Sequence, residues 1–173
     1  MWIIPNNTYI VIITATDDGA GTLTDTQTLT ITVTDVNEAP IITSNGGGST
    51  GSISFAENST SAVTTVTSSD VDASATAAYS ISGTDAGDFN INSSSGALTF
   101  KSAPNFESPD DDGTNNEYIV IVTVTDNGSL TDNQTLTITV TDVNEDIYGC
   151  TDPAACNYDE TANVDDGSCE YYD

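Results

Sequence analysis

The chain has no histidine, and Lys101 is its only basic residue. Its 173 residues include 27 Asp and Glu, which give a formal net charge of −26 at pH 7. Nucleic acids and anionic membranes attract proteins through lysine and arginine, so this charge excludes both as electrostatic partners. No apolar stretch is long enough to span a bilayer. We expect no enzymatic activity, because no serine or cysteine has a nearby base and chance pairs of carboxylates carry no weight in so acidic a chain.

The excess of negative charge bears on whether the chain folds at all. Carboxylates at this density repel one another and oppose compaction, and an acidic chain rich in serine and threonine is typical of disorder. Disorder is the weaker interpretation here, because the apolar residues are periodic rather than sparse. We therefore expect divalent cations to offset the carboxylates.

Cysteine is confined to the last 24 residues of the chain. Such a concentration indicates a small disulfide-stapled unit and an oxidising compartment. Three cysteines cannot all pair with one another. We predict a Cys150–Cys169 disulfide that leaves Cys156 free or paired outside this segment.

One phrase occurs twice. Residues 6–38 read NNTYIVIITATDDGAGTLTDTQTLTITVTDVNE, and residues 115–145 read NNEYIVIVTVTDNGSLTDNQTLTITVTDVNE. Duplication at this distance indicates a tandem array of like modules of about 100 residues. The first copy lacks the front of its module, so we expect the chain to begin in the middle of a module and to be a slice of a longer array.

Both copies carry the pattern of strands. Apolar residues alternate with threonine along 28–34 and again along 135–141, which predicts strands with one face in a core and one in water. The turns DDGAG and DNGS join each of these strands to the preceding one as a hairpin. The preceding strands have inward sets of Tyr9, Val11, Ile13 and Ala15 in the first copy and Tyr118, Val120, Val122 and Val124 in the second. Further short strands are expected at Ile41–Thr43, Ser52–Phe55, Ala62–Thr67, Ala78–Ser82, Phe89–Asn92 and Ala97–Phe100.

These patterns predict an all-β protein. Many short strands separated by Gly, Ser, Asn and Asp clusters, with no segment of helical period, are typical of an antiparallel sandwich. We expect residues 1–38 to be the rear of one module, residues 39–145 a complete module and residues 146–173 a separate cysteine-bearing tail. Pro40 follows the first DVNE phrase and indicates a short, stiff linker.

Five acidic motifs follow one another through the complete module. They are FAEN at Phe55–Asn58, DVD at Asp70–Asp72, NFE at Asn105–Glu107, TVTD ending at Asp126 and DVNE at Asp142–Glu145. In order and spacing they resemble the XEN, DxD, DRE, XDX and DxND calcium motifs of cadherin-type repeats of the bacterial kind. The resemblance implies seven-strand Greek-key sandwiches in tandem. The chain departs from the family where Asn105 replaces an acid, and where Glu38 and Glu145 replace Asp.

The resemblance also implies calcium between modules. Calcium takes about six to eight oxygen ligands, and ligands scattered along a sandwich can converge only at its two poles. The alternative is that these acids are ordinary turn caps. The first junction is expected to hold a single complete calcium site made by Asn37, Glu38, Asp70, Asp72 and Asp126. The second junction would use Glu57, Asn105, Glu107, Asp142, Asn144 and Glu145.

A further acidic run, Asp110 to Asp112, lies in a glycine-containing loop. We expect this run to be solvated. Its members should therefore matter less to calcium binding than Asp70 and Asp72.

The tail, YGCTDPAACNYDETANVDDGSCEYYD, resembles thrombospondin type 3 calcium loops. The resemblance implies alternating oxygen ligands around a turn at Gly167. The alternative is a disulfide loop without metal. The candidate ligands are Asp152, Asn157, Asp159, Asn163, Asp165 and Asp166.

Taken together, these features predict a calcium-rigidified adhesive stalk segment of a large bacterial surface or secreted protein. Its expected partners are calcium and neighbouring like modules of the same chain. One alternative is the subunit of an extracellular fibre made of like chains. Another is a carbohydrate- or protein-binding module, which would need an exposed aromatic cluster; the aromatic-rich stretch outside the strands contains Tyr148, Tyr158, Tyr171 and Tyr172.

Residues 1–38 raise a separate expectation. Two strands alone make a marginal hairpin in water, and its edges invite pairing. Something must therefore cover the apolar face if it is ordered. The simplest cover is the front of the same module in the parent chain, and the alternative is strand addition by another subunit. The face comprises Tyr9, Val11, Ile13, Leu29, Ile31 and Val33.

Overall fold

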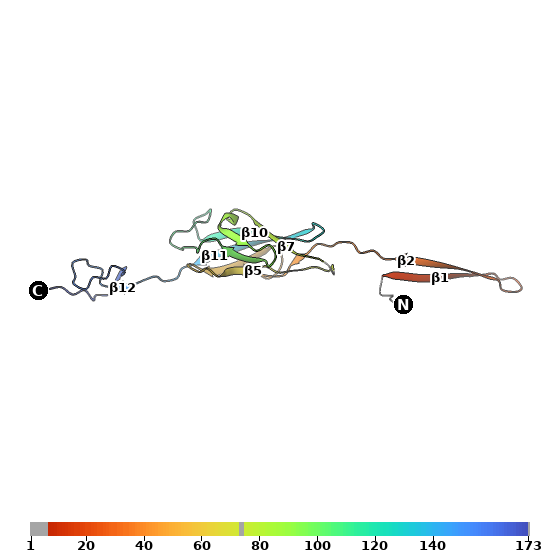
Figure 1. Ribbon diagram of the computed structural model, residues 1–173, viewed down its shortest axis with the longest axis horizontal. Helices are drawn as coiled ribbons and strands as arrows, with labels where there is room; N and C mark the ends of the chain where they lie inside the picture. Colours follow the sequence, from red (N-terminus) through yellow and green to blue (C-terminus); the bar gives the residue numbers. More distant parts are fainter. Residues whose placement is uncertain (1–6, 73–74, 173) are drawn as a thin grey trace. The chain divides into compact units, whose positions relative to one another are not determined.

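A computed structural model describes residues 7–72 and 75–172 (Figure 1). Contacts divide the chain into two compact units, Met1–Glu38 and Ala39–Asp173. Among the described residues the only helix is the three-residue 3₁₀ helix η1, Ala86–Asp88. No helix in that part of the chain has the length and apolar character needed to cross a membrane. The all-β prediction is confirmed.

The first unit is a two-stranded antiparallel hairpin. Strand β1, Thr8–Thr16, pairs with β2, Thr24–Thr32, and Tyr9 lies opposite Ile31. The alternation of apolar residues and threonine thus produced the predicted hairpin. Every residue of β2 is exposed.

The second unit contains two sheets that form the predicted seven-strand sandwich. The larger sheet has the order β4-β11-β10-β7, and the smaller has the order β5-β9-β8. A short pair, β3 with β6, stands beside them. The bounds are β3 Ile41–Ile42, β4 Thr50–Ala56, β5 Ala62–Thr65, β6 Ser68–Ser69, β7 Ala78–Ser82, β8 Phe89–Ile91, β9 Ala97–Phe100, β10 Glu117–Thr125 and β11 Thr131–Thr141.

One pairing within the sandwich is parallel. Strand β4 runs alongside β11 in the same direction, with Ala56 opposite Thr141. The other ladders of the two sheets are antiparallel. Because β4 and β11 are far apart in the sequence, the long connection allows a parallel alignment. The two strands therefore end at the same pole of the sandwich.

The core follows the alternation of β10 and β11. The predicted inward set of β10 is at most 2% exposed, and Leu136, Ile138 and Val140 of β11 are at most 1% exposed. Across the core, the rings of Phe89 and Phe100 have centroids 4.2 Å apart. Burial of such side chains contributes about 1.5–3 kcal/mol each. The core comprises Ile42, Phe55, Val66, Tyr79, Phe89, Leu98, Tyr118, Val120, Val122, Val124, Leu136, Ile138 and Val140.

The expectation that the Asp110–Asp112 run is solvated was wrong for Asp111. This residue is 2% exposed. Its carboxylate accepts hydrogen bonds from the backbone amides of Gly113 at 3.1 Å, Asn115 at 3.0 Å and Asn116 at 3.0 Å. Asp111 therefore shapes the loop that leads into β10, because a buried carboxylate has to be fully hydrogen-bonded.

The tail holds a two-residue parallel pair, β12 (Tyr148–Gly149) with β13 (Val164–Asp165). The predicted Cys150–Cys169 disulfide is present, with Cα atoms 4.8 Å apart. Cys150 is 1% exposed. Cys156 is free and exposed.

Candidate metal centre

Three carboxylates converge at the pole where β4 and β11 end. Glu57 directly follows β4, Asp142 directly follows β11, and Glu107 lies in the loop between β9 and β10. One carboxylate oxygen from each of the three lies within 4.8 Å of those of the other two. The parallel pairing of β4 and β11 brings Glu57 beside Asp142. Three of the six acids and amides predicted for the second junction therefore come together.

Glu57 holds this group in place. It is 3% exposed, and its two oxygens accept hydrogen bonds from the amides of Phe106 and Val143, both at 2.8 Å. Phe106 precedes Glu107, and Val143 follows Asp142. The buried carboxylate thus fixes the backbone beside both other acids. The hydrogen bonds from Phe106 and Val143 lower the pKa of Glu57, so it remains ionised.

Glu107 has the opposite perturbation. A hydrogen bond from its own backbone amide lowers its pKa, but desolvation and the nearby carboxylates of Glu57, Glu145 and Asp142 together raise it. Like charges at this distance disfavour ionisation. A divalent cation would remove that repulsion. Hard carboxylate oxygens from several segments suit Ca²⁺ or Mg²⁺ rather than a softer metal.

The remaining residues of the predicted second junction have other partners. Asn105 accepts a hydrogen bond from the Ser108 amide at 3.0 Å, as a turn cap does. The Asn144 side chain accepts a hydrogen bond from the Asp146 amide at 3.1 Å and donates one to the Asp146 carboxylate at 3.0 Å. Glu145 accepts a hydrogen bond from the side-chain amide of Asn58. The charge of Glu145 is also one of the causes that raise the pKa of Glu107.

The opposite pole carries Asp70, Asp72 and Asp126. One oxygen of Asp70 accepts a hydrogen bond from the Asp72 amide at 2.9 Å, while Oδ2 is buried and has no hydrogen-bond partner among the described residues. Such an oxygen is uncommon. Asp126 is 7% exposed and accepts a hydrogen bond from the Leu130 amide at 2.7 Å. Among the described residues of this pole, the unsatisfied Asp70 oxygen is the sign that a cation fits.

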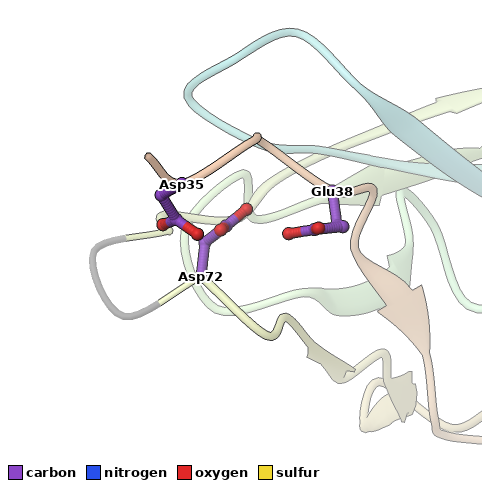
Figure 2. A group of neighbouring side chains, drawn as sticks. All are labelled: Asp35, Glu38 and Asp72. Carbon is purple, nitrogen blue, oxygen red and sulfur yellow. The ribbon is translucent and has the colours of Figure 1, made fainter. Parts of the chain in front are cut away.

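The other residues predicted for the first junction lie on the segment after β2. Figure 2 shows Asp35 and Glu38 on that segment and Asp72 in the loop after β6. The sequence prediction named Asn37 and Glu38 but omitted Asp35. Asp142 occupies the same place in the second DVNE phrase and was named, so aligning the two copies would have found Asp35. The grouping of Asn37 and Glu38 with Asp70, Asp72 and Asp126 stays a prediction.

In the tail, the predicted aspartates cap their own turns, whereas the predicted asparagines tie distant segments together. Asp152 accepts a hydrogen bond from the Tyr171 hydroxyl at 2.6 Å, and that bond is the main reason its pKa is lowered. In the described part of the tail, no three acids converge as they do beside Glu57. The carboxylates of Asp159, Asp165 and Asp166 accept hydrogen bonds from backbone amides two residues further along the chain. Asn157 accepts one from the Glu170 amide and Asn163 one from the Ile147 amide.

The fold has many solved relatives. Protocadherin gamma B2 extracellular cadherin domains 1–5 align with a TM-score of 0.63 and 25% identity over 80% of this chain and 26% of that chain. A protocadherin gammaB7 EC3–6 cis-dimer structure gives 0.61 and 26%, over 80% of this chain and 33% of that chain. Drosophila N-cadherin EC1–4 gives 0.55 at 20% identity, over 80% and 34%, and so supports the fold alone.

The chain thus spans about a third or less of the length of these relatives. No curated protein matches it. The family model described as "Cadherin domain" matches residues 51–141, from the second residue of β4 to the end of β11. This match covers more than half of the 173 residues, and the chain belongs to the cadherin domain family.

Proposed function

We propose that this chain is a calcium-stiffened segment of an extracellular adhesive protein, a stalk of the kind found on bacterial surfaces or secreted by bacteria. The observation that carries the proposal is the convergence of Glu57, Glu107 and Asp142. The titles of two solved relatives, both of protocadherin gamma B2, describe extracellular cadherin domains. The bacterial part of the proposal rests on the resemblance of the acidic motifs.

Calcium at this pole would stiffen the exit from the sandwich. The ion would be held by carboxylates from three segments, and Glu57 also binds the Val143 amide just after β11. Fixing Asp142 and Val143 fixes the first residues of the connection that follows. The neutralised charge would also remove repulsion in a chain of formal charge −26.

The same chemistry is proposed at the first junction. Asn37 and Glu38 would contribute oxygens to Asp70, Asp72 and Asp126, and Asp35 joins them by its equivalence to Asp142. The buried Asp70 Oδ2 supports this site. A cation shared by both segments would limit bending about the linker at Pro40.

A calcium titration tests the proposal. Modules of extracellular type bind calcium with dissociation constants of about 10⁻⁴ to 10⁻³ M, so one site should add about 2.7 kcal/mol of stability at about a hundredfold excess. Glu107→Gln should reduce this gain. Glu117→Gln removes the same charge from an exposed position of β10 and should leave the gain unchanged. A melting temperature that chelator does not move would refute the proposal.

Small-angle scattering supplies the second readout. A stalk should become longer and stiffer with calcium but not with a monovalent salt of equal ionic strength. Unchanged scattering together with raised stability would leave calcium binding intact and remove the stalk function.

A binding module remains the second candidate because the tail tyrosines are exposed. Tyr148 is 62% exposed, Tyr158 44%, Tyr171 60% and Tyr172 91%. Exposed aromatic rings are what sugar or protein ligands stack on. Quenching or a shift of tyrosine fluorescence by oligosaccharides, lost in Tyr171→Ala, would favour this function over the stalk.

A further inference from the structure

The β1–β2 hairpin presents an apolar face that nothing covers among the described residues. Its two strands pair only with each other (Figure 1). Val11 is 42% exposed, Ile13 49%, Leu29 37%, Ile31 50% and Val33 53%. Most of this face would have to be buried in a stable fold.

The β10–β11 hairpin shows how the same sequence is covered. The two hairpins have one register, residue for residue: Tyr9 pairs with Ile31 as Tyr118 pairs with Ile138. The apolar residues of the inner face of β10–β11, and Gln134 among them, are at most 2% exposed. Three further pairs of the first hairpin have the same counterparts in the second: Val11–Leu29 matches Val120–Leu136, Ile13–Gln27 matches Val122–Gln134, and Ala15–Asp25 matches Val124–Asp132.

The cover of β10–β11 comes from the front of its own module. Strand β4 extends the sheet beside β11, and β7 extends it beside β10. The apolar cluster is completed from β5, β8, β9 and their neighbours by Val66, Phe89 and Leu98. All these elements lie within residues 39–114.

Two polar side chains make this cover specific. Gln134 is fully buried. Its side-chain nitrogen donates hydrogen bonds to the backbone carbonyls of Ser44 at 3.3 Å and Gly48 at 3.1 Å, and its side-chain oxygen accepts one from the Asn45 side chain at 3.2 Å. Asp132 accepts a hydrogen bond from the Ile42 amide at 2.8 Å. These four partners belong to residues 42–48, at the front of the module.

The first hairpin carries the same two groups, Gln27 and Asp25, in the same register. If two such hairpins packed face to face, each Gln27 would be buried without those backbone carbonyls, and each Asp25 would lack the amide that Ile42 gives the half-buried Asp132. An unsatisfied buried polar group costs about 1–3 kcal/mol. A second copy of the hairpin is therefore a poor occupant, and a segment with the backbone of residues 42–48 is a good one.

We infer that the inner face of the β1–β2 hairpin is a docking surface for the front half of a like module, a polypeptide with the chemistry of residues 39–114. Its strands would add to both edges of the hairpin. Its apolar sheet would cover Val11 and Leu29. The loop equivalent to Ser44–Gly48 would satisfy Gln27, and the amide equivalent to that of Ile42 would satisfy Asp25.

The test uses the 173-residue chain, isotopically labelled, with an unlabelled polypeptide of residues 39–114 as the probe. Hydrogen exchange is followed at the amides of residues 10–14 and 29–33. At a probe concentration about 100 times the dissociation constant, protection there should rise about 100-fold. A chain with a second copy of residues 39–114 joined ahead of residue 7 gives the same readout if the free probe is insoluble.

Three variants decide between specific docking and general stickiness. Val11→Asp should abolish the gain, whereas Ile10→Asp should keep it, because the matching Ile119 of β10 is 44% exposed in the folded sandwich. Gln27→Leu makes the face more apolar. It should nevertheless weaken docking about tenfold or more, because the buried carbonyls lose their donor.

Three results would overturn the inference. One is no added protection with either the probe or the joined chain. Another is protection that rises with the concentration of the chain alone, which would assign the face to a second copy. The third is docking strengthened by Gln27→Leu, which would mean that apolar contact alone holds the occupant. Because calcium is not needed for this docking, its failure would leave the calcium proposal standing.

Discussion

Replacing Asp111 by alanine separates the acids that build the fold from those that hold metal. The substitution removes three hydrogen bonds between a buried carboxylate and the amides of Gly113, Asn115 and Asn116. Hydrogen bonds to a charged group contribute about 1.5–3 kcal/mol each, and the losses are not fully additive. We therefore expect unfolding to become about 3–5 kcal/mol easier. The melting temperature of the module should fall by more than about 10 °C.

The matched control is Asp112→Ala. Asp112 is exposed and carries the same charge in the same loop, so its loss should change stability by less than about 0.5 kcal/mol. Urea unfolding of both variants, once with excess calcium and once with chelator, measures the effect. The loss in Asp111→Ala should be the same in both conditions.

Two outcomes would contradict this reasoning. A loss below about 1 kcal/mol would mean that the loop finds other partners for its amides. A loss seen only with calcium would mean that Asp111 acts through a metal site. Either result would also undermine the distinction between Asp111 and the acids beside Glu57.

Three further predictions follow from other parts of the chain. The pKa of Glu107 is raised above the usual 4.5, so in the presence of chelator the folded module should lose stability as pH rises from 4.5 through that pKa. Calcium must displace the Glu107 proton, so the calcium affinity measured by calorimetry should fall as pH drops through the same window. Reduction of Cys150–Cys169 should remove about 3 kcal/mol from the tail in the chain-entropy model, visible as faster hydrogen exchange in residues 147–165 with no change in the sandwich. Gly96→Ala should lower the free energy of unfolding, measured by thermal unfolding, by more than about 2 kcal/mol. The reason is that φ of Gly96 is +71° and an added Cβ would lie 2.1 Å from the Val66 carbonyl oxygen. Gly87→Ala is the control, because an added Cβ there would have nothing within 4 Å.

The acids of this chain fall into groups that composition cannot distinguish. Asp85 is 4% exposed and bonds to the amides of Asp112 at 2.9 Å and Ile119 at 2.6 Å, so it fixes the start of β10. Glu57 bonds to two amides in the same manner, yet it also faces two other carboxylates. What separates a structural acid from a candidate ligand is the number of carboxylates that share its surroundings.

Local pattern was sufficient for much of the fold. Alternation of apolar residues with threonine determines which face of a strand can be buried, and β10 and β11 bury the faces that were predicted. The expected short strands near residues 41, 52, 62, 78, 89 and 97 are all present. The predicted Cys150–Cys169 disulfide is one of the three pairings that three cysteines allow, and the structure contains it.

The sequence by itself therefore determined the strands, the inward faces, the repeated hairpin and the order of the acidic motifs. Tertiary structure alone decided which distant groups satisfy the polar side chains of β11: the buried Gln134 receives its partners from Ser44 to Gly48, and the half-buried Asp132 receives the Ile42 amide from 90 residues away. It likewise decided that Asp111 is buried and that Glu57, Glu107 and Asp142 share one pole. The physical reason is that strand alternation depends on near neighbours, whereas a buried polar group is stable only where distant segments supply its hydrogen bonds.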